Sequence, residues 1–214
     1  MKKIKLPWKI LLGVMALLLA AVLGYLIYVF AAYYRVEDNQ TLTVETAGDS
    51  AGGAVSAGEL YRAASYNIGF GAYSNDYSFF MDGGKESRAR SPEAVRENVT
   101  GAMETVKAIA PNFLFLQEVD VDGTRSYHIN ELDLVSAALE GLFQSWTFAQ
   151  NYDSPYLFWP LLEPHGANRA GQATYAAFPI TSAVRRQLPI EDGFMKLVDC
   201  DRCYSVQRIP MADR

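Results

Sequence analysis

Two short segments of this sequence place a polar side chain directly after a strand-like apolar run. Residues 64–70 read Ala-Ser-Tyr-Asn-Ile-Gly-Phe, and residues 113–120 read Phe-Leu-Phe-Leu-Gln-Glu-Val-Asp. Their polar side chains, Asn67 and Glu118, carry oxygen atoms of the kind that a hard cation such as Mg²⁺ accepts as ligands. Alone, Asn67 is better interpreted as a turn residue and Glu118 as a solvated acid. Only the pair indicates chemistry.

The elements between the two segments are expected to bring Asn67 and Glu118 together. One predicted helix separates them, so their strands should be neighbours with both tips on one rim of a sheet. Hydrolysis of a phosphate ester needs a Lewis acid on the phosphoryl oxygens, an activated water and charge compensation at the leaving oxygen. We therefore predict that Glu118 binds a divalent cation, and that Asn67 is a second ligand or orients the phosphate or its nucleophile.

Other polar residues are weaker candidates for the site. Arg125 and Tyr127 follow Glu118 closely and are predicted to bind phosphate, as a guanidinium fork and a phenolic donor. His128 and His165 are the only histidines, and both are interpreted as ordinary loop or surface residues. Seven further basic and aromatic residues are better explained as charges on solvated strand faces or as packing at the domain edge than as substrate contacts. These are Arg185, Arg186, Lys196, Tyr152, Tyr156, Phe158 and Trp159.

The two cysteines do not indicate a zinc site. Cys200 and Cys203 have no second cysteine pair and no histidines at ligand spacing. They are expected to be two thiols near a strand or one local disulfide.

An uncharged apolar run follows four lysines at the N-terminus. The lysines occur within residues 1–9, which contain no acid, and the run covers residues 10–34. About 20 apolar residues cross a bilayer as a helix, and flanking basic residues stay in the cytoplasm. The pattern predicts a single-pass plasma-membrane protein with a cytoplasmic N-terminus and an extracellular remainder. A signal peptide cleaved near Ala31 or Ala32 is the alternative, although its apolar core usually has only about 7 to 15 residues.

The remainder divides into a linker and a domain. Residues 35–58 are rich in Gly, Ala, Ser and Thr, which predicts a flexible linker. Residues 59–214 are predicted to form one domain. Without the four N-terminal lysines, 15 basic and 24 acidic residues remain, a net charge of -9. That charge argues against a purely electrostatic grip on nucleic acid, but not against a metal-assisted phosphoesterase.

Helices and strands alternate early in the domain, and short strands follow. Ser91-Pro92-Glu93 is a helix start, and apolar residues then recur at helical spacing to Ile109. A second amphipathic helix is expected over residues 130–142. The pattern predicts an α/β (α+β) fold with helices flanking sheets, and it fits a TIM barrel or a doubly wound fold less well. The expected strands are residues 60–68, 113–116, 146–149, 172–177, 183–188 and 203–207.

The two segments also resemble the opening motifs of a known superfamily. Ser-Tyr-Asn-Ile-Gly-Phe-Gly and Phe-Leu-Gln-Glu-Val-Asp look like the first motifs of the endonuclease/exonuclease/phosphatase superfamily. Residues 77–89 and 124–131 are similar to its bacterial, membrane-anchored or secreted branch. The resemblance covers residues 60 to 207 and implies a two-layer β-sandwich flanked by helices. It places Glu118 at the position of the family's metal-binding Glu, and Asn67 at that of its first-strand Asn.

Later motifs of that family are missing from the sequence. The chain has no Asp-x-Asn, which the family carries after a later strand, and no Ser-Asp-His, its terminal motif that orders the attacking water and the metal. The resemblance therefore covers the N-terminal portion only. It implies a sandwich that is incomplete at its C-terminus, and a chain that is catalytically silent as it stands.

These observations predict a membrane-anchored, extracytoplasmic phosphoesterase that depends on Mg²⁺, with Mn²⁺ as the alternative cation. Nuclease and phosphatase activity are the first expectations, so the partners are the membrane and a nucleic acid, phosphorylated small molecule or phospholipid. No protein partner is inferred. Two alternatives stay open, a sphingomyelinase-like phospholipid phosphodiesterase and a non-catalytic surface protein. An aromatic wedge near the site would favour lipid, and a basic surface would favour nucleic acid.

Overall fold

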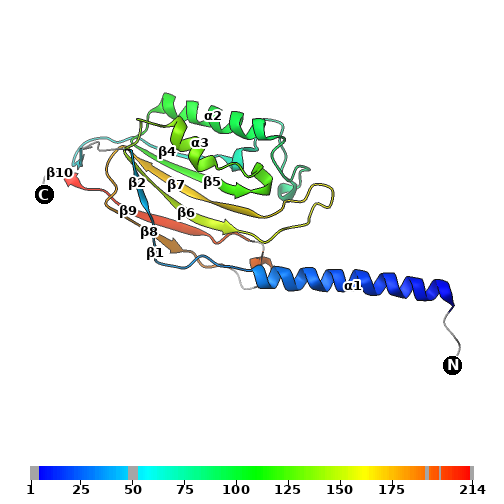
Figure 1. Cartoon of the computed structure of the whole chain (residues 1–214). Helices are drawn as coiled ribbons and strands as arrows, with labels where there is room; N and C mark the ends of the chain where they lie inside the picture. The colour runs from blue at the N-terminus through cyan, green and yellow to red at the C-terminus, as the bar shows by residue number, and fades with distance from the viewer. Residues whose placement is uncertain (1–4, 48–52, 191–192, 198, 213–214) are drawn as a thin grey trace.

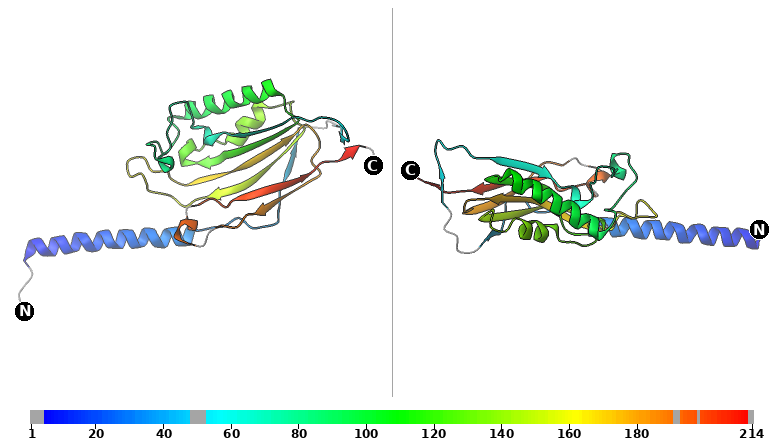
Figure 2. Two further views of the ribbon diagram at one scale, coloured as in Figure 1. Left: turned by 180° about the vertical axis from the view of Figure 1, so that it is seen from behind. Right: turned by 90° about the horizontal axis from the view of Figure 1, so that it is seen from above.

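The structure is a computed structural model that describes residues 5–47, 53–190, 193–197 and 199–212. Two helices, a five-stranded sheet and a three-stranded sheet lie in successive layers, and a long N-terminal helix projects from one end (Figures 1 and 2). This mixed α/β arrangement of helices on layered sheets confirms the predicted fold class.

The projecting helix is α1 (Leu6–Ala32), which is long and apolar enough to cross a membrane. Its 27 residues rise about 40 Å at about 1.5 Å per residue, compared with a hydrocarbon core of about 30 Å. Most of its side chains are exposed, so it is not the core helix of the domain. It begins earlier than the predicted span because Pro7 fits the first helical turn.

The five-stranded sheet has the order β2-β6-β7-β5-β4. β4 and β5 are parallel and are connected through a helix, whereas the other neighbours are antiparallel. Asn67 pairs in register with Gln117, so the two strands that carry the candidate residues are neighbours, as predicted. The strands are β2 (Val44–Thr46), β4 (Ala63–Asn67), β5 (Phe113–Gly123), β6 (Ser145–Asp153) and β7 (Asn168–Ala176).

Two helices, α2 (Pro92–Ile109) and α3 (Glu131–Ala138), cover one face of this sheet (Figure 1). Ser91 caps α2, since its side chain accepts a hydrogen bond from the Ala94 N–H, as its position predicts. α3 is shorter than predicted because residues 139–142 continue as turns. Burying each large apolar side chain contributes about 1.5 to 3 kcal/mol. The core of this layer includes Val95, Val99, Met103, Val106, Leu114, Leu116, Val135 and Tyr175.

A three-stranded sheet of β1 (Gln40–Thr41), β8 (Ser182–Gln187) and β9 (Cys203–Arg208) lies on the opposite face. It packs on the large sheet through a small cluster that includes Leu42, Ala149, Ala176 and Ala183. The sheet does not extend over all of β4 and β5, and Phe115 stays exposed. The apolar run of residues 113–116 is therefore covered on both faces except at Phe115.

The segment predicted to be a flexible linker is part of the fold. Within residues 35–58, β1 and β2 add to the two sheets, and β3 (Val55–Ser56) pairs in parallel with β10 (Met211–Ala212). Residues 48–52 of the predicted linker lie outside the described residues. Composition alone missed these strands because each is only two or three residues long and gains its hydrogen bonds from an unpaired edge of a distant strand.

A buried arginine ties this segment to the sheets. Arg185 lies on β8, and its guanidinium donates to four backbone carbonyls at 2.8 to 3.3 Å. The sequence suggested that Arg185 is a phosphate ligand or, more simply, a solvated charge on a strand face. Both interpretations are wrong, because its side chain is buried. The four acceptors belong to Val36, Glu37, Gln150 and Asp201.

Gly71 tests how tightly the helices pack against the sheet. Its φ is +64°, and an added Cβ would lie 2.7 Å from Val95 Cγ1 and 3.0 Å from Glu131 Oε1. Gly83 also has a positive φ, +87°, but open space surrounds it. We expect Gly71→Ala to lower the free energy of unfolding by about 2 kcal/mol more than Gly83→Ala, because only Gly71 adds overpacking to the backbone cost. Denaturant unfolding in detergent measures both losses, and equal losses would contradict the packing.

Candidate functional site

A cleft of about 490 Å³ opens at the carboxyl ends of β4 and β5. Because these strands are parallel, their carboxyl ends meet at one rim, and α1 projects from this same end of the domain (Figure 1). Asn67, Glu118 and Arg125 all line the cleft, as the sequence predicted for a common site. The other lining side chains include Phe70, Tyr73, Phe79, Met81, Asp82, Gln117, Asn151, Tyr152, His165, Asp199, Cys200 and Arg202.

Asn67 and Glu118 are in direct contact. Asn67 Nδ2 donates to Glu118 Oε1 at 2.9 Å, and Asn67 Oδ1 accepts from the Gly69 N–H at 2.9 Å. Only this amide orientation satisfies both partners, because a carboxylate accepts and a backbone N–H donates. Asn67 is therefore arranged to orient the Glu118 carboxylate, while its own oxygen is already engaged by the turn.

Glu118 has a left-handed backbone conformation, with φ at +55°. It lies at a β-bulge, where the register between β5 and β7 shifts between Leu116 and Val119. A non-glycine residue in this region costs on the order of 1 to 2 kcal/mol, and a bulge re-aims the side chain that it carries. Such strain is common at functional sites, where the surrounding structure maintains it. Here it turns the carboxylate toward the rim.

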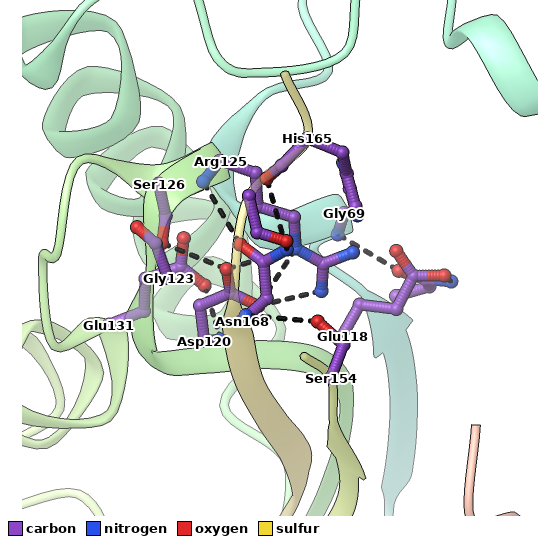
Figure 3. A network of polar contacts seen from close by, with 12 residues as sticks. Gly69, Glu118, Asp120, Gly123, Arg125, Ser126, Glu131, Ser154, His165 and Asn168 are labelled. Atoms are coloured by element: carbon purple, nitrogen blue, oxygen red, sulfur yellow. Dashed lines mark hydrogen bonds and ion pairs between the residues drawn. The ribbon is translucent and has the colours of Figure 1, made fainter. Parts of the chain in front are cut away.

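Arg125 is held at the cleft by a buried ion pair with Asp120 (Figure 3). Its Nη2 lies 2.7 Å from Asp120 Oδ1, and its Nε lies 3.0 Å from Oδ2. Its guanidinium also stacks on Phe70, 4.1 Å from the ring centroid. Burial alone would lower the pKa of Arg125, but the Asp120 carboxylate raises it overall, so the side chain stays charged. No described residue bonds Nη1, which is left to donate to a ligand.

Further hydrogen bonds hold Asp120 in place. Ser126 Oγ donates to the Asp120 carboxylate at 2.8 Å, and the backbone N–H of Asp120 donates to Glu131 Oε2 at 2.9 Å. Burial and the neighbouring Asp120 raise the pKa of Glu131 well above its usual range. A raised pKa keeps a second negative charge from forming beside Asp120.

Tyr127 does not lie in the cleft. Its hydroxyl donates to the Arg90 carbonyl at 3.3 Å, and its ring packs against the core under α2 and α3. The left-handed turn at Tyr127, with φ at +56°, directs its side chain there. The structure therefore does not bring Tyr127 to the site for which the sequence proposed it.

The two histidines differ. His128 is exposed and bonds Asp122 at 2.7 Å, in agreement with its interpretation as a surface residue. His165 is only 1% exposed and lines the cleft, which corrects the expectation of an ordinary loop or surface histidine. It is buried because its Nδ1 bonds the Ser87 carbonyl at 2.9 Å and its ring packs against Phe79 and Phe80.

The environment of His165 makes it a weak base. Burial, and then the charge of Arg125, lower the pKa of His165 to about 4. The ring is therefore neutral at pH 7, with Nδ1 as the donor to Ser87. A group with so low a pKa is poorly matched to general-base catalysis near neutral pH.

The cleft offers few oriented oxygen ligands for a hard cation. Within the described residues, no group of three or more His, Cys, Asp and Glu side chains could hold a metal ion. Asp82 and Asp199 line the cleft, but only Glu118 is oriented by a hydrogen bond from Asn67. Mg²⁺ is often held by one or two carboxylates, while waters and substrate phosphates complete its coordination. Glu118 matches the first of these roles.

The cysteines are free thiols, in agreement with the first of the two expectations. Burial raises the pKa of both thiols, so neither is an activated thiolate.

Comparisons with protein-family models, with curated proteins and with solved structures found no match to this chain. Its function therefore has to be inferred from the cleft. Sequence reasoning found three residues there, Asn67, Glu118 and Arg125. It missed His165, which also lines the cleft, and the buried Asp120, which holds Arg125 in place. The Phe-Leu-Gln-Glu-Val-Asp motif contains Asp120, and a charged residue so close to a buried strand was the available signal for it.

The low pKa of His165 predicts a pH dependence of stability. Because the folded-state pKa lies below the usual value of 6.5, the unfolded chain binds more protons between the two values. The contribution of neutral His165 to the free energy of unfolding is complete above pH 6.5 and is lost as the pH falls to about 4. The loss amounts to up to roughly 3 kcal/mol. Unfolding of the wild type and His165→Gln from pH 7 to 4 measures it. The variant should lose less stability than the wild type over this range, and parallel curves would contradict the assignment.

Proposed function

We propose that this chain carries the cation-binding and phosphate-binding part of a membrane-anchored, extracytoplasmic phosphoesterase of the endonuclease/exonuclease/phosphatase type. The observation that carries the proposal is the Asn67 to Glu118 hydrogen bond of 2.9 Å at the rim of the cleft, with Glu118 held in a strained bulge. The resemblance of the two motifs around these residues supports the same reading.

Each residue of the cleft has a distinct role in this proposal. Glu118 would hold Mg²⁺ or Mn²⁺ through the carboxylate oxygen that Asn67 does not bond. Asn67 is a positioning residue for that carboxylate. Arg125 would donate its remaining N–H groups to a phosphate oxygen. When bound, the cation supplies Lewis-acid polarisation of the phosphoryl group.

The cleft offers no strong general base among its described residues. His165 is a weak base, and burial together with Asp82 raises the pKa of Tyr73 to about 12. We therefore expect these 214 residues to bind cation and phosphate without robust turnover. This gap is also what supports the alternative of a non-catalytic surface protein, which would bind no cation at Glu118.

A phospholipid substrate is the second candidate. Exposed aromatic side chains, Phe158 and Trp159, lie on the loop that also carries His165 of the cleft. The net charge of -9 outside the N-terminal lysines disfavours nucleic acid. A sphingomyelinase-like phosphodiesterase therefore fits these observations better than a nuclease does.

Contacts between α1 and the domain support an uncleaved anchor. Val29 of α1 is buried, and the Tyr25 hydroxyl donates to the Tyr156 carbonyl at 3.1 Å. Lys5 and Lys9 are exposed near the start of α1, where basic residues favour the cytoplasmic side. The domain at the other end of the helix would then lie outside the cell.

Cation binding tests the proposed site directly. We expect the purified chain to bind Mn²⁺, measured by electron paramagnetic resonance, in competition with Mg²⁺. Asn67→Ala should weaken binding by about 10- to 100-fold, as expected on loss of a group that orients a ligand. Glu118→Gln should weaken it at least as much, because it removes the negative charge of the carboxylate that Asn67 orients.

Asp122→Asn is the matched control, because Asp122 is a partly exposed acid of the same strand that pairs with Arg169 and His128 outside the cleft. It should bind Mn²⁺ like the wild type. Unchanged binding by Glu118→Gln would overturn the site, and robust ester turnover by the wild type would contradict the expected silence.

The anchor and its orientation can be tested in cells. We expect the mature chain to keep α1, to resist extraction from membranes by carbonate, and to lose its domain when intact cells are treated with protease. N-terminal sequencing would identify cleavage. A soluble product that starts near Tyr33, or a domain protected in intact cells, would contradict the proposed topology.

A further inference from the structure

The loop between β6 and β7 presents an apolar surface to solvent. Residues 157–162 read Leu-Phe-Trp-Pro-Leu-Leu, a run without a polar side chain. Phe158 is 52% exposed, Trp159 65% and Leu161 74%, and Leu162 is fully exposed. A contiguous exposed group of this kind marks an interaction site or a membrane contact.

This loop packs directly against α1. The Tyr25 hydroxyl donates to the Tyr156 carbonyl at 3.1 Å, and the Tyr156 N–H donates to the Tyr28 hydroxyl at 2.9 Å. The Tyr25 and Phe158 rings meet edge to face, with centroids 5.1 Å apart. The apolar loop is thereby continuous with the surface of the membrane helix.

The length of α1 sets the level of this contact relative to a bilayer. With Lys9 at the inner boundary, a hydrocarbon core of about 30 Å extends over about 20 helical residues, to about the position of Val29 in α1. Tyr25 and Tyr28 therefore fall near the outer boundary of the core, where tyrosines are enriched. Phe158, which packs on Tyr25, lies at the same level.

The loop and the cleft are at one end of the domain. In all three views the free part of α1 and the loop between β6 and β7 project from the same end, and β10 lies at the opposite end (Figures 1 and 2). The loop carries His165 into the cleft wall, next to the segment of Phe79 and Met81 that lines the cleft. Met81 is itself exposed.

The nearest acid of the loop does not oppose insertion of its apolar run. Glu163 follows Leu162, and its carboxylate lies 3.5 Å from Ser87 Oγ, at the base of the loop. Its backbone carbonyl accepts a hydrogen bond from the same hydroxyl. The exposed Glu163 carboxylate therefore lies beside Ser87 at the base of the loop, while the side chains of Phe158, Trp159, Leu161 and Leu162 are exposed beyond it.

We propose that residues 158–162 insert into the outer interface of the bilayer that α1 spans, so that the cleft with Glu118 faces the membrane surface. The occupant of this apolar surface is the lipid bilayer, because the surface continues directly from the membrane helix. The inference rests on the anchor proposed above. On the proposed function, lipid phosphates are then the first phosphate esters within reach of Glu118.

Tryptophan fluorescence of the full chain in phosphatidylcholine vesicles tests the docking without using activity. The lipid is brominated either near the glycerol end of its acyl chains or near the chain ends, since bromine quenches nearby tryptophan. The contribution of Trp159 is the difference between Trp8→Phe and Trp8→Phe/Trp159→Phe. We expect Trp159 to be quenched several-fold more strongly by the shallow bromines than by the deep ones.

Two further variants report the orientation of the cleft. A tryptophan from Met81→Trp, in the Trp8→Phe/Trp159→Phe background, should be quenched weakly but measurably by a headgroup-level quencher. The control Leu60→Trp, in the same background, replaces an exposed side chain that precedes β4. The amino end of β4 lies away from the cleft, which opens at the carboxyl end of this strand. It should show no quenching by lipid.

The outcomes separate the docking from the anchor. Carbonate-resistant insertion without quenching of Trp159 would overturn the docking while the anchor stands. Trp159 that is shielded from acrylamide but not quenched by lipid would also overturn it, because a protein surface would then cover the loop. Equal quenching at Leu60→Trp and Met81→Trp would refute the orientation of the cleft.

Discussion

The buried ion pair between Asp120 and Arg125 fixes the turn that follows β5, beside Glu118 and the cleft. Taking two charges out of water costs several kcal/mol per ion unless good geometry and further hydrogen bonds compensate. Here the guanidinium makes a double contact, Ser126 donates to the carboxylate, and the Arg125 N–H donates to Asn168 Oδ1 at 3.0 Å. Removal of one partner from such a pair costs about 3 to 5 kcal/mol. The turn after β5 therefore cannot move without losing this energy, and the bulge at Glu118 is held from its C-terminal side.

The same network extends into the loop between β6 and β7. Asn168 donates through Nδ2 to the His165 carbonyl at 3.2 Å, and its N–H donates to Ser154 Oγ at 3.1 Å. Both ends of the loop are thus bonded to a residue that is itself bonded to Arg125. The loop that carries Phe158 is therefore fixed to the same support as Glu118. A displacement of the loop would therefore move Asn168 and, through it, Arg125 at the cleft.

The sequence predicted the parts of this structure that local patterns determine. Ser91 with Pro92 and a helical apolar face defined α2, and one intervening helix made β4 and β5 neighbours. The parts it missed depend on distant partners. The strands of residues 35–58 exist because β6 and β8 offer them edges, and Arg185 is buried because four remote carbonyls accept from it. The left-handed backbone of Glu118 has no composition signal either, because a bulge arises from a mismatch between two strands.

The charges of the cleft bear on how an anionic ligand could enter. Arg125 is already neutralised by Asp120, and Arg202 lies 3.6 Å from Asp199. Among the described residues, the remaining charged side chains that line the cleft are Asp82 and Glu118, both acidic. A cleft with this balance repels phosphate at close range. An anion binds only where positive charges exceed negative ones within a few ångströms of it, and here the unpaired charges are negative. On the proposed function, phosphate therefore enters only together with a divalent cation at Glu118, and dependence on the cation follows from the electrostatics of binding before any catalytic step is considered.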